Sequence, residues 1–272
     1  MQPTPLEQKV RDHLYSELLL APLRKCAVYL PKMGGTGEVD LPGFRALYGG
    51  DPLYQWVGLD SDLMFAAHKA AGGMTSVYRQ LGIGCERLFR QTLRDELRLT
   101  AEQVKWAYEV VVEEGGKTRV KTLTLDGRVE IDEVADGLDR QRVGGWIDAQ
   151  RSRLSIGAQL KGAVFEVRQG YKSADSKRQN ADLASAAQAL GDGYLPTLVV
   201  MSTQMNHVVR TRYEAGNWAV LTGAVTSSDP LQSTFAFVQE VVGYDLVGFF
   251  ERNTQVLRAE VEGILGSLLE PT

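Results

Sequence analysis

The sequence predicts an α/β protein in which a mixed β-sheet, an antiparallel meander continued by parallel strands, is flanked by helices. Three observations predict this fold. The spacing of apolar residues changes from a helical period to an alternating one after Thr100. Paired turn residues then separate runs of β-branched side chains. Two helix-and-strand units follow, each short enough to cross over between parallel strands.

The composition is that of an ordinary globular protein. The chain has 272 residues, of which 44% are hydrophobic and 24% charged, enough for a sizeable core. No apolar run approaches the roughly 20 residues of a membrane helix, and the charged residues near the N-terminus are unlike a signal peptide. We therefore expect a cytoplasmic protein with no membrane partner. Two cysteines and three scattered histidines argue against a disulfide framework or a zinc site.

The first part of the chain is predicted to be mostly helical. Leucine and valine at three- and four-residue spacing predict a helix over residues 5–30. Glycine, proline and aromatic residues over 39–59 predict loops packed on a core. Two more helices are expected, over 61–71 and over 83–97. Residues 1–80 are thus expected to be a helical N-terminal elaboration.

The middle of the chain predicts five strands. The runs VKWAYEVVVEE and TRVKTLTLDGRVEIDEV alternate or are β-branched, and Gly115-Gly116 and Asp126-Gly127 are typical hairpin turns. They predict three strands in an antiparallel meander. The segments GGWIDAQ (144–150) and AVFEVRQ (163–169) predict two more strands.

Two crossover units then follow. A helix over 176–190 leads to the apolar run TLVVMS, which requires the strands with Phe165 and Val199 to be parallel. A helix over 204–215 and the strand NWAVLTG repeat this order. Because there is no linker-like segment or internal repeat, we expect one domain, with the core over 81–222 and C-terminal helices over 223–272.

The charges are unevenly distributed along the sequence. The chain has 30 basic and 34 acidic side chains, a net charge of −4. Residues 140–180 contain nine basic and three acidic side chains, so this segment is +6 and the remainder is −10. A basic segment in an acidic body is typical of a focused site for a polyanion. Ordinary solvated charges on strands and loops are the alternative.

Two carboxylates in the predicted sheet are candidate ligands of a metal ion. Asp148 in GWID and Glu166 in FEVR lie on neighbouring predicted strands, so they could share one divalent ion, and oxygen ligands suit Mg²⁺. Side chains alternate along a strand, which places Arg168 and Lys172 on the same face as Glu166. Metal ions and a nearby cation are the groups that phosphodiester hydrolysis requires. The alternative is a turn residue and ordinary surface charges.

At these residues the sequence resembles the PD-(D/E)xK nuclease superfamily, most closely the type II restriction endonucleases. The resemblance covers about residues 80–222 and implies a restriction-endonuclease-like core. It also implies Mg²⁺-dependent cleavage, with Asp148 and Glu166 as metal ligands and Glu86 on the first core helix as a further one.

The sequence departs from this family at the lysine. Arg168 stands where the family usually has lysine, and it is permanently charged, so it can bind phosphate but cannot act as a base. Lys172 is the alternative, and it could take part only if the chain bends at Gly170.

The segment RQGYKSADSKRQNAD is the expected DNA-binding region. It runs from the strand with Glu166 onto the start of a helix, where backbone N–H groups favour phosphate. Its side chains are of types that contact sugar, phosphate and base edges, and the candidates are Tyr171, Lys172, Lys177, Arg178, Gln179 and Asn180. A solvated helix start is the alternative.

Several alternatives stay open. The acidic cluster Glu130, Asp132, Glu133 and Asp136 is another source of the first ligand, with Asp132 in place of Asp148. The resemblance implies a homodimer on palindromic double-stranded DNA, with the C-terminal helices as an interface. A repair or recombination nuclease with the same core is the enzymatic alternative. A non-catalytic DNA-binding or protein-interaction module, in which Arg168 marks a decayed site, is the other.

Overall fold

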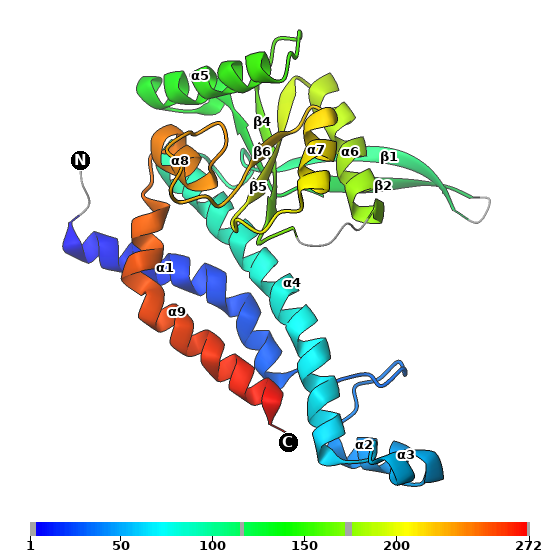
Figure 1. The fold of residues 1–272 in the computed structure, drawn as a ribbon. Coiled ribbons are helices and arrows are strands. Elements are labelled where there is room, and N and C mark those ends of the chain that lie inside the picture. Colours follow the sequence, from blue (N-terminus) through cyan, green and yellow to red (C-terminus); the bar gives the residue numbers. More distant parts are fainter. Residues whose placement is uncertain (1–3, 115–116, 172–175, 271–272) are drawn as a thin grey trace. The chain divides into compact units, whose positions relative to one another are not determined.

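A computed structural model describes residues 4–114, 117–171 and 176–270 (Figure 1). The chain divides into two compact units. The first combines residues 1–84 with 251–272, and the second is formed by residues 85–250. Within the described ranges, no helix combines the length and the apolar character needed to span a membrane.

The first unit is helical. A buried cluster joins three of its helices and includes Leu20, Leu23, Val77, Ile264 and Leu268. The helices, of which the last two extend into the second unit, are α1 (Pro5–Arg24), α2 (Leu41–Tyr48), α3 (Pro52–Val57), α4 (Asp62–Leu97) and α9 (Leu246–Leu269). A short 3₁₀ helix, Lys25–Val28, follows α1.

The expected loops over 39–59 are wrong, because this stretch forms α2 and α3. Asp40 and Asp51 cap these two helices by accepting hydrogen bonds from backbone N–H groups of the first turn. Both helices also begin with a proline in the first turn, a position that proline favours.

The two helices expected over 61–71 and 83–97 form one 36-residue helix, α4. The glycines between them do not break it. At Gly84 a Cβ atom would lie 2.4 Å from the carbonyl oxygen of Leu19, so glycine here permits close approach of α1. The helix expected over 5–30 ends at Arg24.

The second unit contains a four-stranded mixed sheet in the order β3-β4-β5-β6. β3 is antiparallel to β4, whereas β4, β5 and β6 are parallel to one another. The strands are β3 (Gly127–Glu130), β4 (Gly162–Arg168), β5 (Tyr194–Val200) and β6 (Ala219–Leu221). The crossover helices are α6 (Ser176–Gly191) and α7 (His207–Ala215). The predicted mixed sheet with flanking helices and both crossovers are confirmed.

The predicted meander is wrong in one respect. β1 (Trp106–Glu114) and β2 (Lys117–Leu125) form a separate two-stranded antiparallel sheet. β3 pairs with β4, and the register Glu130↔Gly162 begins that ladder. A Cβ atom at Gly162 would lie 2.2 Å from the carbonyl oxygen of Val129, so the two backbones meet closely here.

The segment 144–150 is helical, and its prediction as a strand is wrong. It belongs to α5 (Gly137–Arg153), which Asp136 caps. The residues that α5 buries, Val143, Trp146, Ile147 and Gln150, recur at three- and four-residue spacing, which is a helical period. The remaining short helices are a 3₁₀ turn (Ile131–Glu133), α8 (Thr234–Phe237) and a π-helical turn (Val238–Val242).

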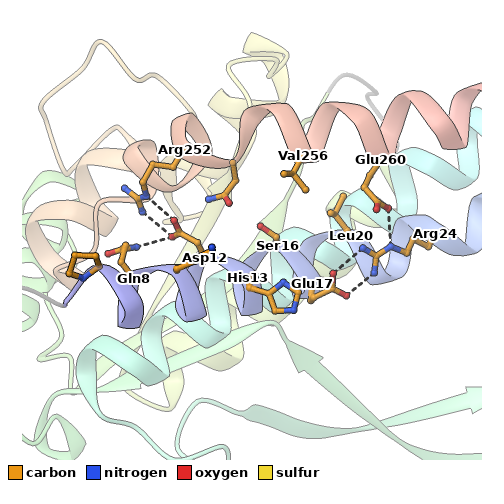
Figure 2. Close-up of a pocket in the computed structure, with 13 residues that line it drawn as sticks. Gln8, Asp12, His13, Ser16, Glu17, Leu20, Arg24, Arg252, Val256 and Glu260 are labelled. Carbon is orange, nitrogen blue, oxygen red and sulfur yellow. Dashed lines mark hydrogen bonds and ion pairs between the residues drawn. The ribbon is translucent and has the colours of Figure 1, made fainter.

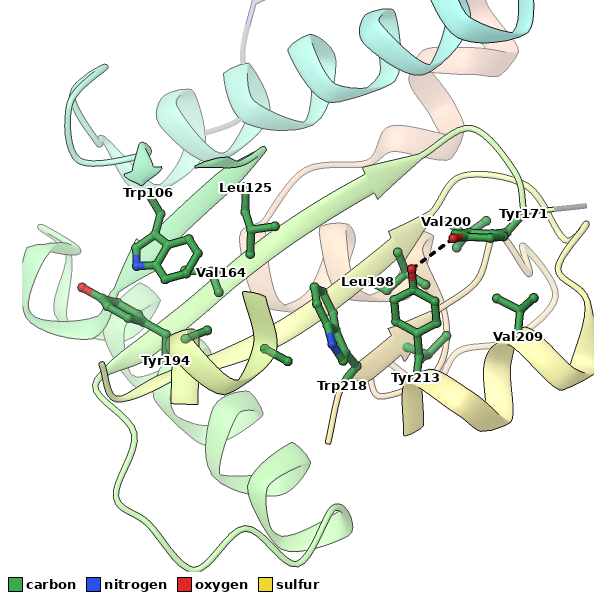
Figure 3. Close-up of a cluster of buried hydrophobic side chains, with 13 residues drawn as sticks. Trp106, Leu125, Val164, Tyr171, Tyr194, Leu198, Val200, Val209, Tyr213 and Trp218 are labelled. Carbon is green, nitrogen blue, oxygen red and sulfur yellow. Dashed lines mark hydrogen bonds between the residues drawn. The ribbon is translucent and has the colours of Figure 1, made fainter. Parts of the chain in front are cut away.

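Both faces of the mixed sheet are covered. On the face that Figure 3 shows, Val164 and Leu198 pack with Tyr213 and Trp218 in a cluster that includes alanines of α6. On the opposite face, Phe165 packs against aromatic residues of α4 and α8, and Trp146 of α5 packs there on Phe237. Every residue of β4 is buried, as is usual for a strand in a covered sheet. Polar side chains on β4 therefore need partners inside the protein.

Candidate acidic site on the mixed sheet

Glu166 and Arg168 of β4 form a buried ion pair. Their side chains lie on the sheet face that α6 and α7 cover, and each residue is less than 9% exposed. The Nη2 of Arg168 contacts Oε1 of Glu166 and lies 3.3 Å from Oδ2 of Asp182 on α6. Burial lowers the pKa of Arg168, but the surrounding carboxylates outweigh burial, so the pKa is raised above its ordinary value. Arg168 is thus a fixed internal cation.

Two tyrosines extend this network behind Asp182. The hydroxyl of Tyr213 donates a hydrogen bond to Asp182, and the hydroxyl of Tyr171 lies 3.2 Å from that of Tyr213. Burial and the Asp182 carboxylate raise the pKa of Tyr213 well above its ordinary value, so its hydroxyl stays protonated. The Nε of Arg168 is buried and has no hydrogen-bond partner among the residues that the structure describes. This donor is the unsatisfied group of the cluster, and unsatisfied buried donors are rare in native proteins.

Asp126 lies next to this pair, between β2 and β3. Its backbone N–H donates to the carbonyl oxygen of Phe165 at 2.8 Å, and its Oδ2 accepts from the N–H of Val167 at 2.8 Å. The β3–β4 register pairs Gly127 with Phe165, so its continuation places Asp126 opposite Glu166. Residues opposite each other in an antiparallel pair have Cβ atoms about 4.5–5.5 Å apart. Asp126 is half-buried.

The long helix α4 also reaches this position. The Nε of Arg90 donates to the carbonyl oxygen of Asp126 at 2.6 Å. Glu86 lies one turn before Arg90 and shares its side of the helix. The predicted supporting carboxylate, Glu86, therefore lies on the turn of α4 next to the Asp126 contact.

Asp148 does not join Glu166, and its prediction as the partner acid is wrong. It lies on the solvent side of α5, where its side chain is 60% exposed and 3.4 Å from Nε of Arg151. α5 buries Trp146 and Ile147 against the sheet face opposite to that of Glu166. The sheet therefore separates the two carboxylates.

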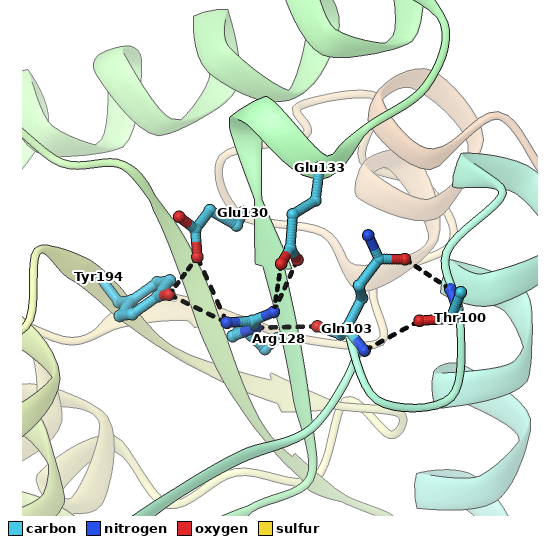
Figure 4. A network of polar contacts seen from close by, with 6 residues as sticks. All are labelled: Thr100, Gln103, Arg128, Glu130, Glu133 and Tyr194. Atoms are coloured by element: carbon cyan, nitrogen blue, oxygen red, sulfur yellow. Dashed lines mark hydrogen bonds and ion pairs between the residues drawn. The ribbon is translucent and has the colours of Figure 1, made fainter.

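The alternative acidic cluster lies at the other end of the β3–β4 pair. Glu130 and Glu133 both bind Arg128, at 3.3 and 2.6 Å, and Arg128 also donates to Tyr194 (Figure 4). Asp132 is exposed on the 3₁₀ turn beyond β3. Because the register pairs Glu130 with Gly162 rather than with Glu166, these acids do not complete the Glu166 site.

The predicted DNA-reading residues fall into three groups. Tyr171 and Gln179 are 6% and 3% exposed, so their prediction as DNA contacts is wrong. The Nη1 of Arg212 on α7 donates to Gln179 at 2.9 Å, and its Nη2 donates to the exposed Asn180. Lys172 and the side chains of Lys177 and Arg178 lie outside the described residues. The expected phosphate contact of Arg168 is replaced by its contacts with Glu166 and Asp182.

Two carboxylates near Arg168 are the candidate oxygen ligands for a hard divalent ion. Among the residues that the structure describes, no group of three or more His, Cys, Asp or Glu side chains is arranged to hold a metal ion. Mg²⁺, however, is usually bound through one or two carboxylates with water completing its coordination. Asp126, in the bend between β2 and β3, and Glu166 on β4 are two carboxylates of this kind, although Glu166 also contacts Arg168.

A cavity in the first unit has a different character. It measures about 610 Å³ and lies along α1 and α9 (Figure 2). Asp12 binds Arg252 at 2.8 Å, and Arg24 binds both Glu17 and Glu260. Burial raises the pKa of Asp12, but hydrogen bonds from Arg252 and Gln8 outweigh burial and hold the pKa below its ordinary value. These pairs join the two helices.

The sequence does not single out Asp126, Asp182 or Tyr213 as members of this cluster. Asp126 has the pattern of a turn residue, and the register that places it opposite Glu166 is not visible in the sequence. Comparisons of the chain with protein-family models, with curated proteins and with solved structures found no match.

Proposed function

We propose that this chain is a magnesium-dependent type II restriction endonuclease that hydrolyses phosphodiester bonds in double-stranded DNA. The observation that carries the proposal is the position of Asp126 opposite Glu166, with a cation two residues further along β4. The order of antiparallel strand, parallel strand and crossover helix around this pair supports a restriction-endonuclease-like core. Asp126 takes the role that the sequence assigned to Asp148.

Each residue of the site has a distinct task in this proposal. Asp126 and Glu166 would hold Mg²⁺, whereas Glu86 is not grouped with them as a third ligand among the described residues. A bound divalent ion lowers the pKa of water and stabilises the charge that develops on the phosphoryl group. Arg168 cannot act as a base. Its contacts with Glu166 and Asp182 instead orient Glu166 and offset the repulsion between two buried carboxylates.

The test compares Asp126→Asn and Glu166→Gln with Asp148→Asn, the matched control. Each protein is incubated with phage DNA and Mg²⁺, and the products are separated by size. We expect discrete bands from the parent protein and from Asp148→Asn. We expect cleavage to fall at least about 100-fold in the other two variants, since even outer partners of metal ligands change activity 10- to 100-fold. Full cleavage by Asp126→Asn, or its loss in Asp148→Asn, contradicts the site.

A non-catalytic DNA-binding protein is the second candidate. The direct contact between Arg168 and Glu166 favours it, because an internal cation then occupies the carboxylate that a metal ion needs. Binding of duplex DNA without hydrolysis in both Mg²⁺ and Mn²⁺ would distinguish this function.

A smear or branch-specific products would instead indicate a repair or recombination nuclease. By symmetry, cleavage of a palindrome would require a homodimer, which sedimentation with a palindromic duplex would reveal.

A further inference from the structure

The β1–β2 hairpin is an arm that is anchored at its base. Its strands pair from Trp106↔Leu125 outwards and belong to a sheet separate from β3–β6. Trp106 and Leu125 are each 6% exposed and belong to the core cluster, and the hydroxyl of Tyr108 lies 3.0 Å from that of Ser185 on α6. An isolated two-stranded hairpin is marginally stable, so these contacts hold the arm in place.

The outer part of the arm is open to solvent. Val111 and Val120 are directly paired, and they are 69% and 61% exposed. Figure 1 shows the two strands extending away from the four-stranded sheet. Because both valines are so exposed, contacts with the rest of the chain contribute little to the stability of this pair.

Charges are segregated between the two faces of the arm. Directly paired residues share a face, and successive residues alternate. Arg119 and Lys121 therefore lie on the same face as Tyr108. Glu109 and Glu113 lie on the opposite face. These four residues are exposed, so the described charged side chains make one face of the arm basic and the other acidic.

The basic face is turned toward α6, the helix that covers the candidate site. Tyr108, on that face, contacts α6, the helix that also carries Asp182 beside Glu166. β2 ends at Leu125, and Asp126 is the next residue. At about 3.3 Å per residue, Lys121 lies about 17 Å and Arg119 about 23 Å along the strand from Asp126. The arm is therefore joined directly to one of the two acids.

We infer that this hairpin is a DNA-binding arm, whose basic face contacts the phosphates of a duplex held at the Asp126–Glu166 site. The inference rests on the proposed function and adds to it the surface that grips the substrate. Charge complementarity selects the occupant, because a polyanion meets Arg119 and Lys121 while Glu109 and Glu113 lie on the other face. A two-stranded ribbon also has dimensions that the major groove admits.

The experiment compares two double variants on opposite faces of the same arm. Arg119→Gln with Lys121→Gln removes the basic face, and Glu109→Gln with Glu113→Gln is the matched control. Both are made in the Glu166→Gln background, so that the DNA stays intact. Fluorescence anisotropy of a labelled duplex is measured between 50 and 200 mM KCl, and circular dichroism verifies the fold.

We expect the basic-face variant to bind at least about 10-fold more weakly at 50 mM KCl. Each lost phosphate contact reduces the slope of log K against log salt by about 0.9, so this slope should fall by about 2. The control should bind no more weakly than its parent. An unchanged salt slope in the basic-face variant, or an equal loss of DNA affinity in both variants, contradicts the role of the hairpin as a DNA-binding arm. If either of these results is obtained but the unmodified protein cuts DNA, only the inference about the arm is contradicted. If the unmodified protein neither binds nor cuts a duplex, the proposed function is contradicted too.

Discussion

Two arginines on adjacent strands, Arg128 and Arg168, each lie between two carboxylates and a tyrosine. Around Arg128 every donor group has a partner in the protein: the Gln103 carbonyl oxygen at 2.8 Å, then Glu130, Glu133 and Tyr194 (Figure 4). Its carboxylates are 24% and 28% exposed, whereas those around Arg168 are each 9% exposed.

The difference bears on the proposed site, because the two clusters differ in burial and in whether every donor group of the arginine has a partner. The donors of Arg128 all have partners and its carboxylates are partly exposed, so this cluster ties β3 to its neighbours at modest cost. The Arg168 cluster is more deeply buried, and within the described part of the chain its Nε has no partner. Arg168 Nε is one of six such buried side-chain atoms among the described residues, and a functional role is one explanation for an atom of this kind. The half-buried Asp126 lies beside the drier cluster and not beside the other.

The largest expected effect concerns stability. Arg168→Met leaves Glu166 and Asp182 buried without their cation, and removal of one partner from a buried ion pair costs about 3–5 kcal/mol. Arg128→Met should cost only about 1 kcal/mol, because its partners remain partly solvated. Urea unfolding of both variants measures the two free energies. Equal losses would show that the clusters do not differ in the way proposed.

The next effect concerns cleavage. Asp182→Asn keeps the shape of the side chain but removes the charge that holds Arg168 beside Glu166, so we expect the rate to fall about 10- to 100-fold. Glu133→Gln is the matched change in the Arg128 cluster and should leave the rate unchanged. Initial rates on a duplex with Mg²⁺ provide the comparison. A similar loss of cleavage rate in both variants would show that the Arg168 cluster has no special role in cleavage.

The smallest effect concerns alkaline pH. Burial and the hydrogen bond with Glu130 raise the pKa of Tyr194 to about 12, compared with about 10 in an unfolded chain. A group whose pKa is raised by folding contributes stability below pH 10 and loses it as the pH rises toward 12. The pKa of Tyr213 is raised further, by burial and Asp182.

Tyr194→Phe and Tyr213→Phe should therefore each reduce the fall in unfolding free energy between pH 10 and 12. The measurement is urea unfolding at pH 9, 10, 11 and 12. A fall as steep as that of the parent protein in Tyr194→Phe would show that this tyrosine does not couple to folding.

The sequence predicted the crossover units but not the site. The strands with Phe165 and Val199 are runs of apolar residues bounded by turns, and a helix between them leaves few alternatives to a parallel pair. The Gly144-Gly145 pair is typical of a turn before a strand that contains GWID. This segment is nevertheless helical, and Trp146 and Ile147 are buried from the helix. Glu166 is a candidate from the sequence because it lies inside an apolar strand. Its partner Asp126 resembled an ordinary hairpin turn, and only tertiary pairing distinguishes the two.

The close backbone contact at Gly162 has a consequence for genetic screens. This glycine and Val129 meet at one end of the short ladder whose opposite end carries the two acids. Any added methyl group must push the strands apart, and the ladder would pass that displacement on to the carboxylates. Loss-of-function alleles should therefore arise at a residue that has no side chain and touches no ligand.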